Sequence, residues 1–173
     1  MKILLTGATG YIGKRLLPLL LDHGNEVICC VRDKNRFCFP EQFKNKIKVI
    51  EVDFLDPESL KNIPNDIDAA YYLIHSMSGA SNYDELESIS ANYFIEKINQ
   101  TNAKQIIYLS GIVNDQSLSK HLSSRKAVEE ILKTAAVPST VLRAGIIVGS
   151  GSASFEIISS SLIFFKALSN ACL

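Results

Sequence analysis

The sequence predicts an α/β protein with a doubly wound parallel sheet of about six strands, and three observations point to it. Short apolar runs alternate along the chain with longer segments of helical periodicity. Runs such as Glu26 to Val31 carry few polar residues, as expected of strands covered on both faces. A glycine-rich turn joins the first run, Lys2 to Leu5, to the first helical segment. Alternating strands and helices favour a parallel sheet with right-handed crossovers.

The elements are expected in a regular order. The first helix is expected to end near Gly24, and the connector from Asp33 to Lys46 to hold one helical turn. Later strands are expected at Lys48 to Val52, Ala69 to Ile74, Gln105 to Leu109 and Thr140 to Val148. Later helices are expected at Pro57 to Asn62, Tyr83 to Thr101, Lys120 to Thr134 and Phe155 to Leu168. The predicted buried stripe of the Tyr83 helix is Leu86, Ile89, Tyr93 and Ile98.

Composition narrows the class of protein. The chain has 173 residues, 47% of them apolar and 21% charged, which suits one domain with a core. A net charge of zero argues against a nucleic-acid partner and an anionic membrane surface. No apolar run has the length of a membrane span, and no secretion leader is expected. The four cysteines form no CxxC pair, which indicates reduced thiols, a cytoplasmic location and no metal site.

The turn after the first strand has the pattern TGATGYIG. Gly7 allows a sharp turn, Gly10 lets the backbone approach a ligand closely, and Gly13 lets the helix pack on the strand. A helix N-terminus offers unpaired amides and partial positive charge, so it suits a diphosphate. A glycine-rich surface turn is the alternative interpretation. The residues predicted to hold a dinucleotide here are Gly7, Thr9, Gly10, Tyr11, Ile12 and Gly13.

Polar residues follow the second and third strands, where a doubly wound (Rossmann) fold places its ligand crevice. Arg32 follows the second strand, and a guanidinium there suits the 2′-phosphate of NADP. Asp33 follows Arg32, and it leaves NAD as the alternative cofactor, because a carboxylate accepts hydrogen bonds from the hydroxyl groups of a ribose. Asp53 and Phe54 close the third strand and could meet an adenine, although Phe54 also suits core packing.

Three further residues form a candidate catalytic set. Ser110 ends the fifth strand, and His121 precedes Arg125 by four positions, so the last two share one helix face. The histidine could donate a proton near neutral pH, and the arginine could orient an anionic substrate or the cofactor ribose. A surface histidine and a solvated arginine are the alternative.

Together these motifs resemble the short-chain dehydrogenase/reductase superfamily, in its extended and atypical branches of nucleoside-diphosphate-sugar epimerase-like and NmrA-like proteins. The resemblance spans Met1 to about Ile158, which predicts a dinucleotide-binding domain over residues 1–158 and an unassigned apolar tail over 159–173. The motifs that carry it are TGATGYIG, VRD at Val31 to Asp33, VDF at Val52 to Phe54, YYLIHSM at Tyr71 to Met77, YLSG at Tyr108 to Gly111 and LRAGIIVGSGSASFE at Leu142 to Glu156.

The resemblance implies a bound NADP or NAD, with Leu73, Ile74 and His75 beneath the cofactor. Such proteins typically transfer hydride with a Tyr-x-x-x-Lys pair and a nearby Ser or Thr. This chain has HLSSR at that place, and arginine does not replace lysine as a tunable acid. Gly111 and Ile112 stand where a catalytic hydroxyl often lies.

Two functions follow from these features. One is an NADP-dependent oxidoreductase or nucleotide-sugar epimerase-like enzyme acting on an unknown small molecule. The alternative is an NmrA-like cofactor-binding sensor or scaffold without turnover. Extended members of the superfamily carry a C-terminal substrate region of about 100 residues, which is missing here. The apolar helix at Phe155 to Leu168 is then expected to pack on the sheet or on a second copy.

Overall fold

The computed structural model describes residues 1–39, 41–75, 82–112, 120–150 and 152, without the side chains of Lys120 and His121. The chain divides into two compact units, Met1–Arg143 and Ala144–Leu173. In the second unit, the Ser152 amide donates to the Gly149 carbonyl over 2.8 Å and closes a turn. The predicted helix from Phe155 to Leu168 and the tail over 159–173 lie outside the described residues.

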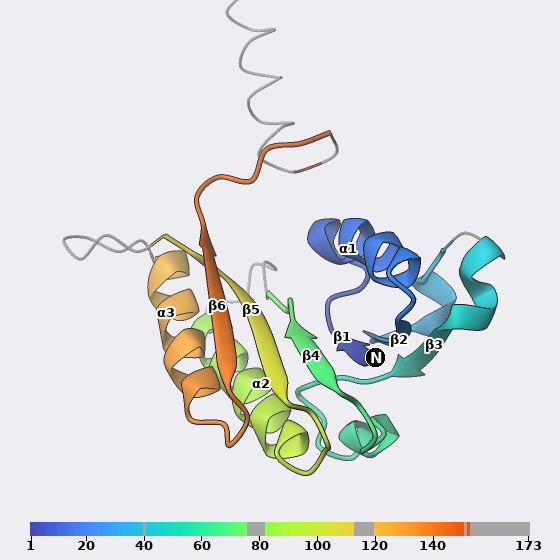
Figure 1. The fold of residues 1–173 in the computed structure, drawn as a ribbon. Helices are drawn as coiled ribbons and strands as arrows, with labels where there is room; N and C mark the ends of the chain where they lie inside the picture. Colours follow the sequence, from blue (N-terminus) through green and yellow to red (C-terminus); the bar gives the residue numbers. More distant parts are fainter. Residues whose placement is uncertain (40, 76–81, 113–119, 151, 153–173) are drawn as a thin grey trace, which may run out of the picture. The chain divides into compact units, whose positions relative to one another are not determined.

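The sheet has six strands in the order β3-β2-β1-β4-β5-β6 (Figure 1). The four pairs of neighbouring strands from β3 to β5 are all parallel. The order reverses between β1 and β4, where a doubly wound sheet binds its ligands, so the predicted fold class is confirmed. The strands are β1 Lys2–Leu5, β2 Glu26–Val31, β3 Ile47–Glu51, β4 Ala69–Tyr72, β5 Gln105–Gly111 and β6 Ser139–Ala144.

Three helices cover the two faces of this sheet. They are α1 Tyr11–Asp22, α2 Tyr83–Ile98 and α3 Lys120–Lys133. Leu17 and Leu21 of α1 pack in one apolar cluster, whereas α2 and α3 contribute to the other and lie side by side (Figure 1). The adjacent β1 residues Leu4 and Leu5 enter opposite clusters, as the strand pleat requires.

Most predicted elements are present with shifted ends. The strand predicted over Ala69 to Ile74 ends at Tyr72, and the strand predicted to reach Val148 ends at Ala144. β5 continues two residues beyond Leu109, and α2 ends at Ile98 instead of Thr101. The segments predicted to hold one weak turn and a short helix form 3-10 turns at Lys34–Arg36, Glu41–Lys46 and Ser59–Asn62.

The predicted buried stripe of α2 is wrong except at Ile98. Leu86, Ile89 and Tyr93 are only partly buried, because they flank the face that meets the sheet and α3. That face includes the acidic side chain of Glu87, whose Oε2 accepts a hydrogen bond from Ser124 Oγ of α3. Apolar residues on both flanks leave the helix weakly amphipathic, so periodicity alone misplaces the face. The buried residues are Glu87, Ser90, Ala91, Phe94, Ile95 and Ile98.

Two glycines with positive φ offer a matched test of crowding at the first turn. Gly7 has φ 64°, and an added Cβ would lie 2.4 Å from the Leu73 carbonyl oxygen. Gly24 has φ 77°, and an added Cβ would meet nothing within 4 Å. We expect Gly24→Ala to lower the free energy of unfolding by about 1 kcal/mol through backbone strain alone. Gly7→Ala adds overpacking and should cost about 3 kcal/mol.

Urea denaturation of both variants measures this difference. Equal losses of stability in the two variants would contradict the crowding at Gly7.

Candidate functional site

The turn between β1 and α1 is fixed at both ends by hydrogen bonds. Thr6 Oγ1 donates to the Tyr71 carbonyl and accepts from the Leu73 amide, both over 2.9 Å, which ties β1 to the end of β4. The Gly10 amide donates to the Gly7 carbonyl over 2.9 Å. The chain therefore leaves β1, reverses within four residues and enters α1 beside the neighbouring strand.

Glycine is required where this turn is most crowded. An added Cβ on Gly13 would lie 2.3 Å from the Gly7 carbonyl oxygen, closer than any real Cβ contact. Gly10 is the N-cap of α1 and offers no side chain to its first amides, and the first turn holds no acidic residue. The amides at the start of α1 thus have no capping side chain, and the positive end of the helix faces the turn.

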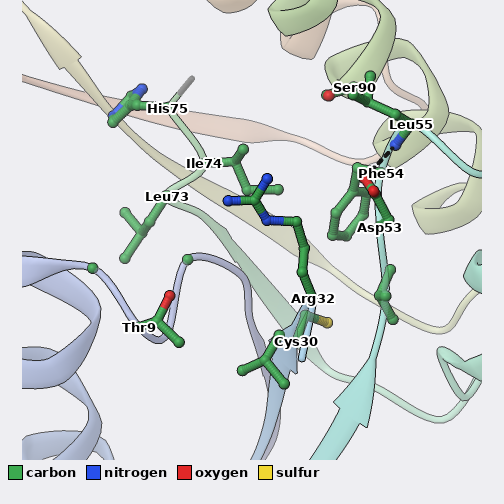
Figure 2. A pocket seen from close by; sticks show the side chains of 14 residues that line it. Thr9, Cys30, Arg32, Asp53, Phe54, Leu55, Leu73, Ile74, His75 and Ser90 are labelled. Carbon is green, nitrogen blue, oxygen red and sulfur yellow. Dashed lines mark hydrogen bonds between the residues drawn. The ribbon is translucent and has the colours of Figure 1, made fainter. Parts of the chain in front are cut away.

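A groove of about 480 Å³ opens beside this turn, at the carboxyl ends of the central strands (Figure 2). It is lined by the segments that follow β1, β2, β3 and β4, together with the last two residues of β2 and Ser90 of α2. The lining residues are Gly7, Thr9, Gly10, Cys30, Val31, Arg32, Val52, Asp53, Phe54, Leu55, Leu73, Ile74, His75 and Ser90.

The structure brings most of the predicted cofactor residues to this one groove. Those that do not line it are Tyr11, Ile12, Gly13 and Asp33. Gly13 is buried in the contact between turn and helix, and the Tyr11 ring lies 4.3 Å beneath the Arg15 guanidinium. The groove is also lined by five residues that the sequence did not single out: Cys30, Val31, Val52, Leu55 and Ser90. Val31, Val52 and Leu55 each adjoin a predicted residue, Cys30 lies two positions before Arg32, and Ser90 lies on the face of α2 that periodicity misplaced.

At the β2 end of the groove, Arg32 and Asp33 have different surroundings. The Arg32 side chain points into the groove (Figure 2), and its guanidinium forms no ion pair within the described residues. Asp33 Oδ1 accepts from the Asn35 amide over 2.8 Å and begins a 3-10 turn. Arg32 therefore lines the groove, whereas the adjacent Asp33 stabilises a local turn.

The neighbouring β3 end combines a carboxylate and an aromatic ring. Asp53 Oδ1 accepts from the Leu55 amide over 3.0 Å, as the dashed line in Figure 2 shows. Phe54 is buried, and its ring centroid lies 5.8 Å from that of Phe94. Phe54 thus packs in the core, as one interpretation of the sequence expected, and it also lines the groove, while its contact with an adenine stays a prediction.

His75 occupies the opposite end of the lining from Phe54 (Figure 2). Its ring centroid lies 6.3 Å from that of Tyr108, which β5 holds in the core. Burial, and to a lesser degree the positive charge of Arg125, lowers the pKa of His75 from 6.5 to about 4. The imidazole is therefore neutral at physiological pH. Burial also raises the pKa of the Cys30 thiol far above its ordinary value, so Cys30 stays protonated.

Of the predicted catalytic residues, Ser110 and Arg125 are absent from the described lining of the groove. Ser110 is fully buried, because it shares the side of β5 on which Ile106 and Tyr108 enter the core. Arg125 is partly buried on α3, with its Cδ 3.7 Å from the position of a Cβ on Gly111. His121 lies in the first turn of α3, and its side chain is outside the described residues. The catalytic roles of these three residues stay predictions.

Two other kinds of site are not found in the part of the chain that the structure describes. It holds no group of three His, Cys, Asp or Glu side chains arranged to bind a metal ion. Within the same residues, each helix is too short or too polar to cross a bilayer.

Comparisons with known proteins agree with this geometry. A glycine turn at the switch point of a parallel sheet defines the class of Rossmann dinucleotide-binding proteins. A family model described as NAD(P)H-binding matches residues 7–162. The chain therefore belongs to the NAD(P)H-binding family, in agreement with the dinucleotide-binding resemblance that its motifs carry.

Individual relatives are distant and longer than this chain. An uncharacterized protein of Saccharomyces cerevisiae, YLL056C, is 25% identical over 116 residues, which are 66% of this chain and 39% of the relative. A nucleoside-diphosphate-sugar epimerase from Staphylococcus aureus matches with TM-score 0.69 and 20% identity, over 83% of this chain and 50% of that one. The Citrobacter sp. triphenylmethane reductase complexed with NADP(H) matches with TM-score 0.68 and 21% identity, over 86% of this chain and 50% of the reductase. The chain thus spans about half the length of these proteins or less.

The lowered pKa of His75 predicts a pH dependence of stability. Between about pH 6.5 and pH 4 the unfolded chain binds a proton at His75 that the folded chain does not. Stability therefore falls as the pH decreases through this window, and it is unaffected by His75 above it. Urea midpoints at pH 7 and pH 5 should separate more in the wild type than in His75→Gln.

His23→Gln is the matched control. His23 is exposed at the end of α1, where its Nδ1 lies 2.8 Å from the Leu19 carbonyl oxygen. This variant should keep the wild-type pH dependence. The same dependence in all three proteins would contradict a partly buried, neutral His75.

Proposed function

We propose that this chain is the cofactor domain of an NADP-dependent oxidoreductase. The observation that carries the proposal is one groove along the carboxyl ends of four strands, which joins a glycine turn, a neutral histidine and an arginine that forms no ion pair with another described residue. Glycines that tolerate no Cβ produce the turn, so the residues present fit a diphosphate held by backbone amides. Membership of the NAD(P)H-binding family supports the same cofactor.

The lining suggests how a dinucleotide lies in the groove. The diphosphate meets the backbone of Gly7, Thr9 and Gly10 and the start of α1. The adenosine half lies toward Arg32, Asp53 and Phe54, where a cation, a carboxylate and a ring edge are available. The nicotinamide half lies toward Leu73 to His75, at the other end. Tyr11, Ile12 and Gly13 act here by shaping the turn and the first helical amides.

The choice of NADP over NAD rests on the two residues after β2. Arg32 lines the groove without an ion pair among the described residues, which leaves its guanidinium available to a 2′-phosphate. Asp33, which would serve a ribose hydroxyl in an NAD site, already accepts a backbone hydrogen bond and lies off the groove. Structures that resemble this fold were crystallised with NADP(H) and with NAD+, so the choice is argued from the residues of this chain.

A pair of single substitutions tests the assignment of Arg32. Arg32→Ala should weaken NADPH binding about 10- to 100-fold, since hydrogen bonds between charged groups contribute about 1.5–3 kcal/mol. NADH affinity should change less than about twofold, because NADH lacks the phosphate that Arg32 contacts. Calorimetric titration of both cofactors measures the ratio.

Lys34→Ala is the control for a general loss of positive charge. Lys34 is exposed, does not line the groove and lies with its Nζ 3.8 Å from Glu51 Oε2. It should leave both affinities within about twofold of the wild type. Equal weakening of NADPH and NADH by Arg32→Ala, or the same effect from Lys34→Ala, would contradict the 2′-phosphate contact.

The reaction follows from the cofactor. A bound NADPH supplies a hydride, so reduction of a carbonyl or a similar electrophilic carbon is the reaction class proposed. A carbonyl panel with the purified chain and NADPH distinguishes an enzyme from a sensor or scaffold without turnover. We further propose a cytoplasmic location, in agreement with the free, buried thiols of Cys29 and Cys30. A small-molecule substrate and an oligomer formed through the apolar residues after 155 stay proposals from the sequence.

A further inference from the structure

Few of the described residues that line the groove have ionisable side chains, and these side chains lie in different parts of the groove. Arg32 and Asp53 lie in the part assigned to the adenosine half, and Cys30 is a buried protonated thiol. Among the described lining residues, this leaves His75 as the ionisable group at the opposite end. Ser110 and Arg125, the residues predicted for catalysis, are absent from the lining.

His75 is held in place by groups from two other elements. Its ring lies against Tyr108 of β5, at 6.3 Å between centroids and with the planes 54° apart. Tyr108 is itself fixed, because it is fully buried and its hydroxyl donates to the Arg125 carbonyl over 3.3 Å. The backbone before His75 is tied to β1, since the Leu73 amide donates to Thr6 Oγ1.

We propose that His75 is the catalytic hydrogen-bond donor of this chain, acting on the oxygen of a substrate carbonyl beside the nicotinamide. The inference rests on the proposed function, because it needs NADPH in the groove. Arg125 of α3 then acts as a positioning residue. Its positive charge lowers the pKa of His75 and so disfavours the protonated, positively charged imidazole. The inference also moves the proton donor from His121, where the sequence places it, to a residue of the groove itself.

The proposed step balances in atoms and electrons. The hydride forms a C–H bond at the carbonyl carbon, and the π pair of the C=O bond moves to oxygen. That oxygen takes a proton from the neutral imidazole N–H, which leaves an imidazolate. The ring then takes a proton from water, and the hydroxide that this releases is neutralised by solvent, so the net proton of the reaction comes from solvent. A neutral imidazole donor places no positive charge beside the substrate before charge develops on its oxygen, and donors fixed at such a place act mainly in the transition state.

The three histidines of the chain provide the experiment. His75→Phe keeps a ring against Tyr108 but removes the donor, and His75→Gln keeps an N–H donor that cannot titrate. His121→Gln tests the rival donor, and His23→Gln is the surface control. With NADPH and 4-nitrobenzaldehyde as the probe, we expect His75→Phe to lower kcat about 100-fold, with KM within about threefold. His75→Gln should recover part of the rate, and the other two should stay within about threefold of the wild type.

A second readout does not depend on turnover. In NMR spectra of the imidazole C–H groups at pH 7, saturating NADPH should shift the His75 signals and leave those of His23 unchanged. Unchanged His75 signals with bound NADPH, wild-type kcat in His75→Phe, or loss of rate in His121→Gln instead would overturn the inference. Bound NADPH with no reduction of the probe by the wild type would also overturn it. Absence of NADPH binding in calorimetry would instead refute the proposed function.

Discussion

Close approach of three backbone segments at the first turn is the constraint on which the structure depends. The turn after β1 lies against Leu73 on one side and against the start of α1 on the other, and neither contact leaves room for a Cβ on Gly7 or Gly13. Thr6 ties the same point to β4 through two hydrogen bonds. Because β1 and β4 flank the reversal in strand order, these contacts set both the topology of the sheet and the width of the groove.

The groove is chemically asymmetric, and this asymmetry supports the proposed orientation of the cofactor. One end presents an exposed guanidinium and a carboxylate from the ends of β2 and β3. The other presents an imidazole that burial keeps neutral. A ligand with phosphates in its middle and at one end, and a neutral reacting group at the other, matches this distribution. Burial is the main reason that the ring carries no charge, and the positive charge of Arg125 adds to it.

Local patterns in the sequence predicted the fold and the glycine turn. The direction in which individual side chains point depends on tertiary packing and could not be predicted. The three glycines, the strand alternation and Arg32 were all visible in the sequence because each depends on a short segment. The position of Ser110 at the end of a strand did not reveal that its side chain shares the side of β5 with Tyr108 and is buried with it. Ser90 was missed because apolar residues on both flanks of α2 hid the buried face. The low pKa of His75 could not be predicted, because it comes mainly from burial in the folded chain and to a lesser degree from Arg125, which is fifty positions away in the sequence.

Backbone amide NMR with increasing NADPH tests the central claim most directly, because the proposed diphosphate contacts are N–H groups and carry no side chain to mutate. The account predicts that the amides of Thr9, Gly10, Tyr11 and Ile12 move most and saturate together with the calorimetric binding curve. Saturable binding that leaves these four amides unmoved, or no binding at all, would contradict it.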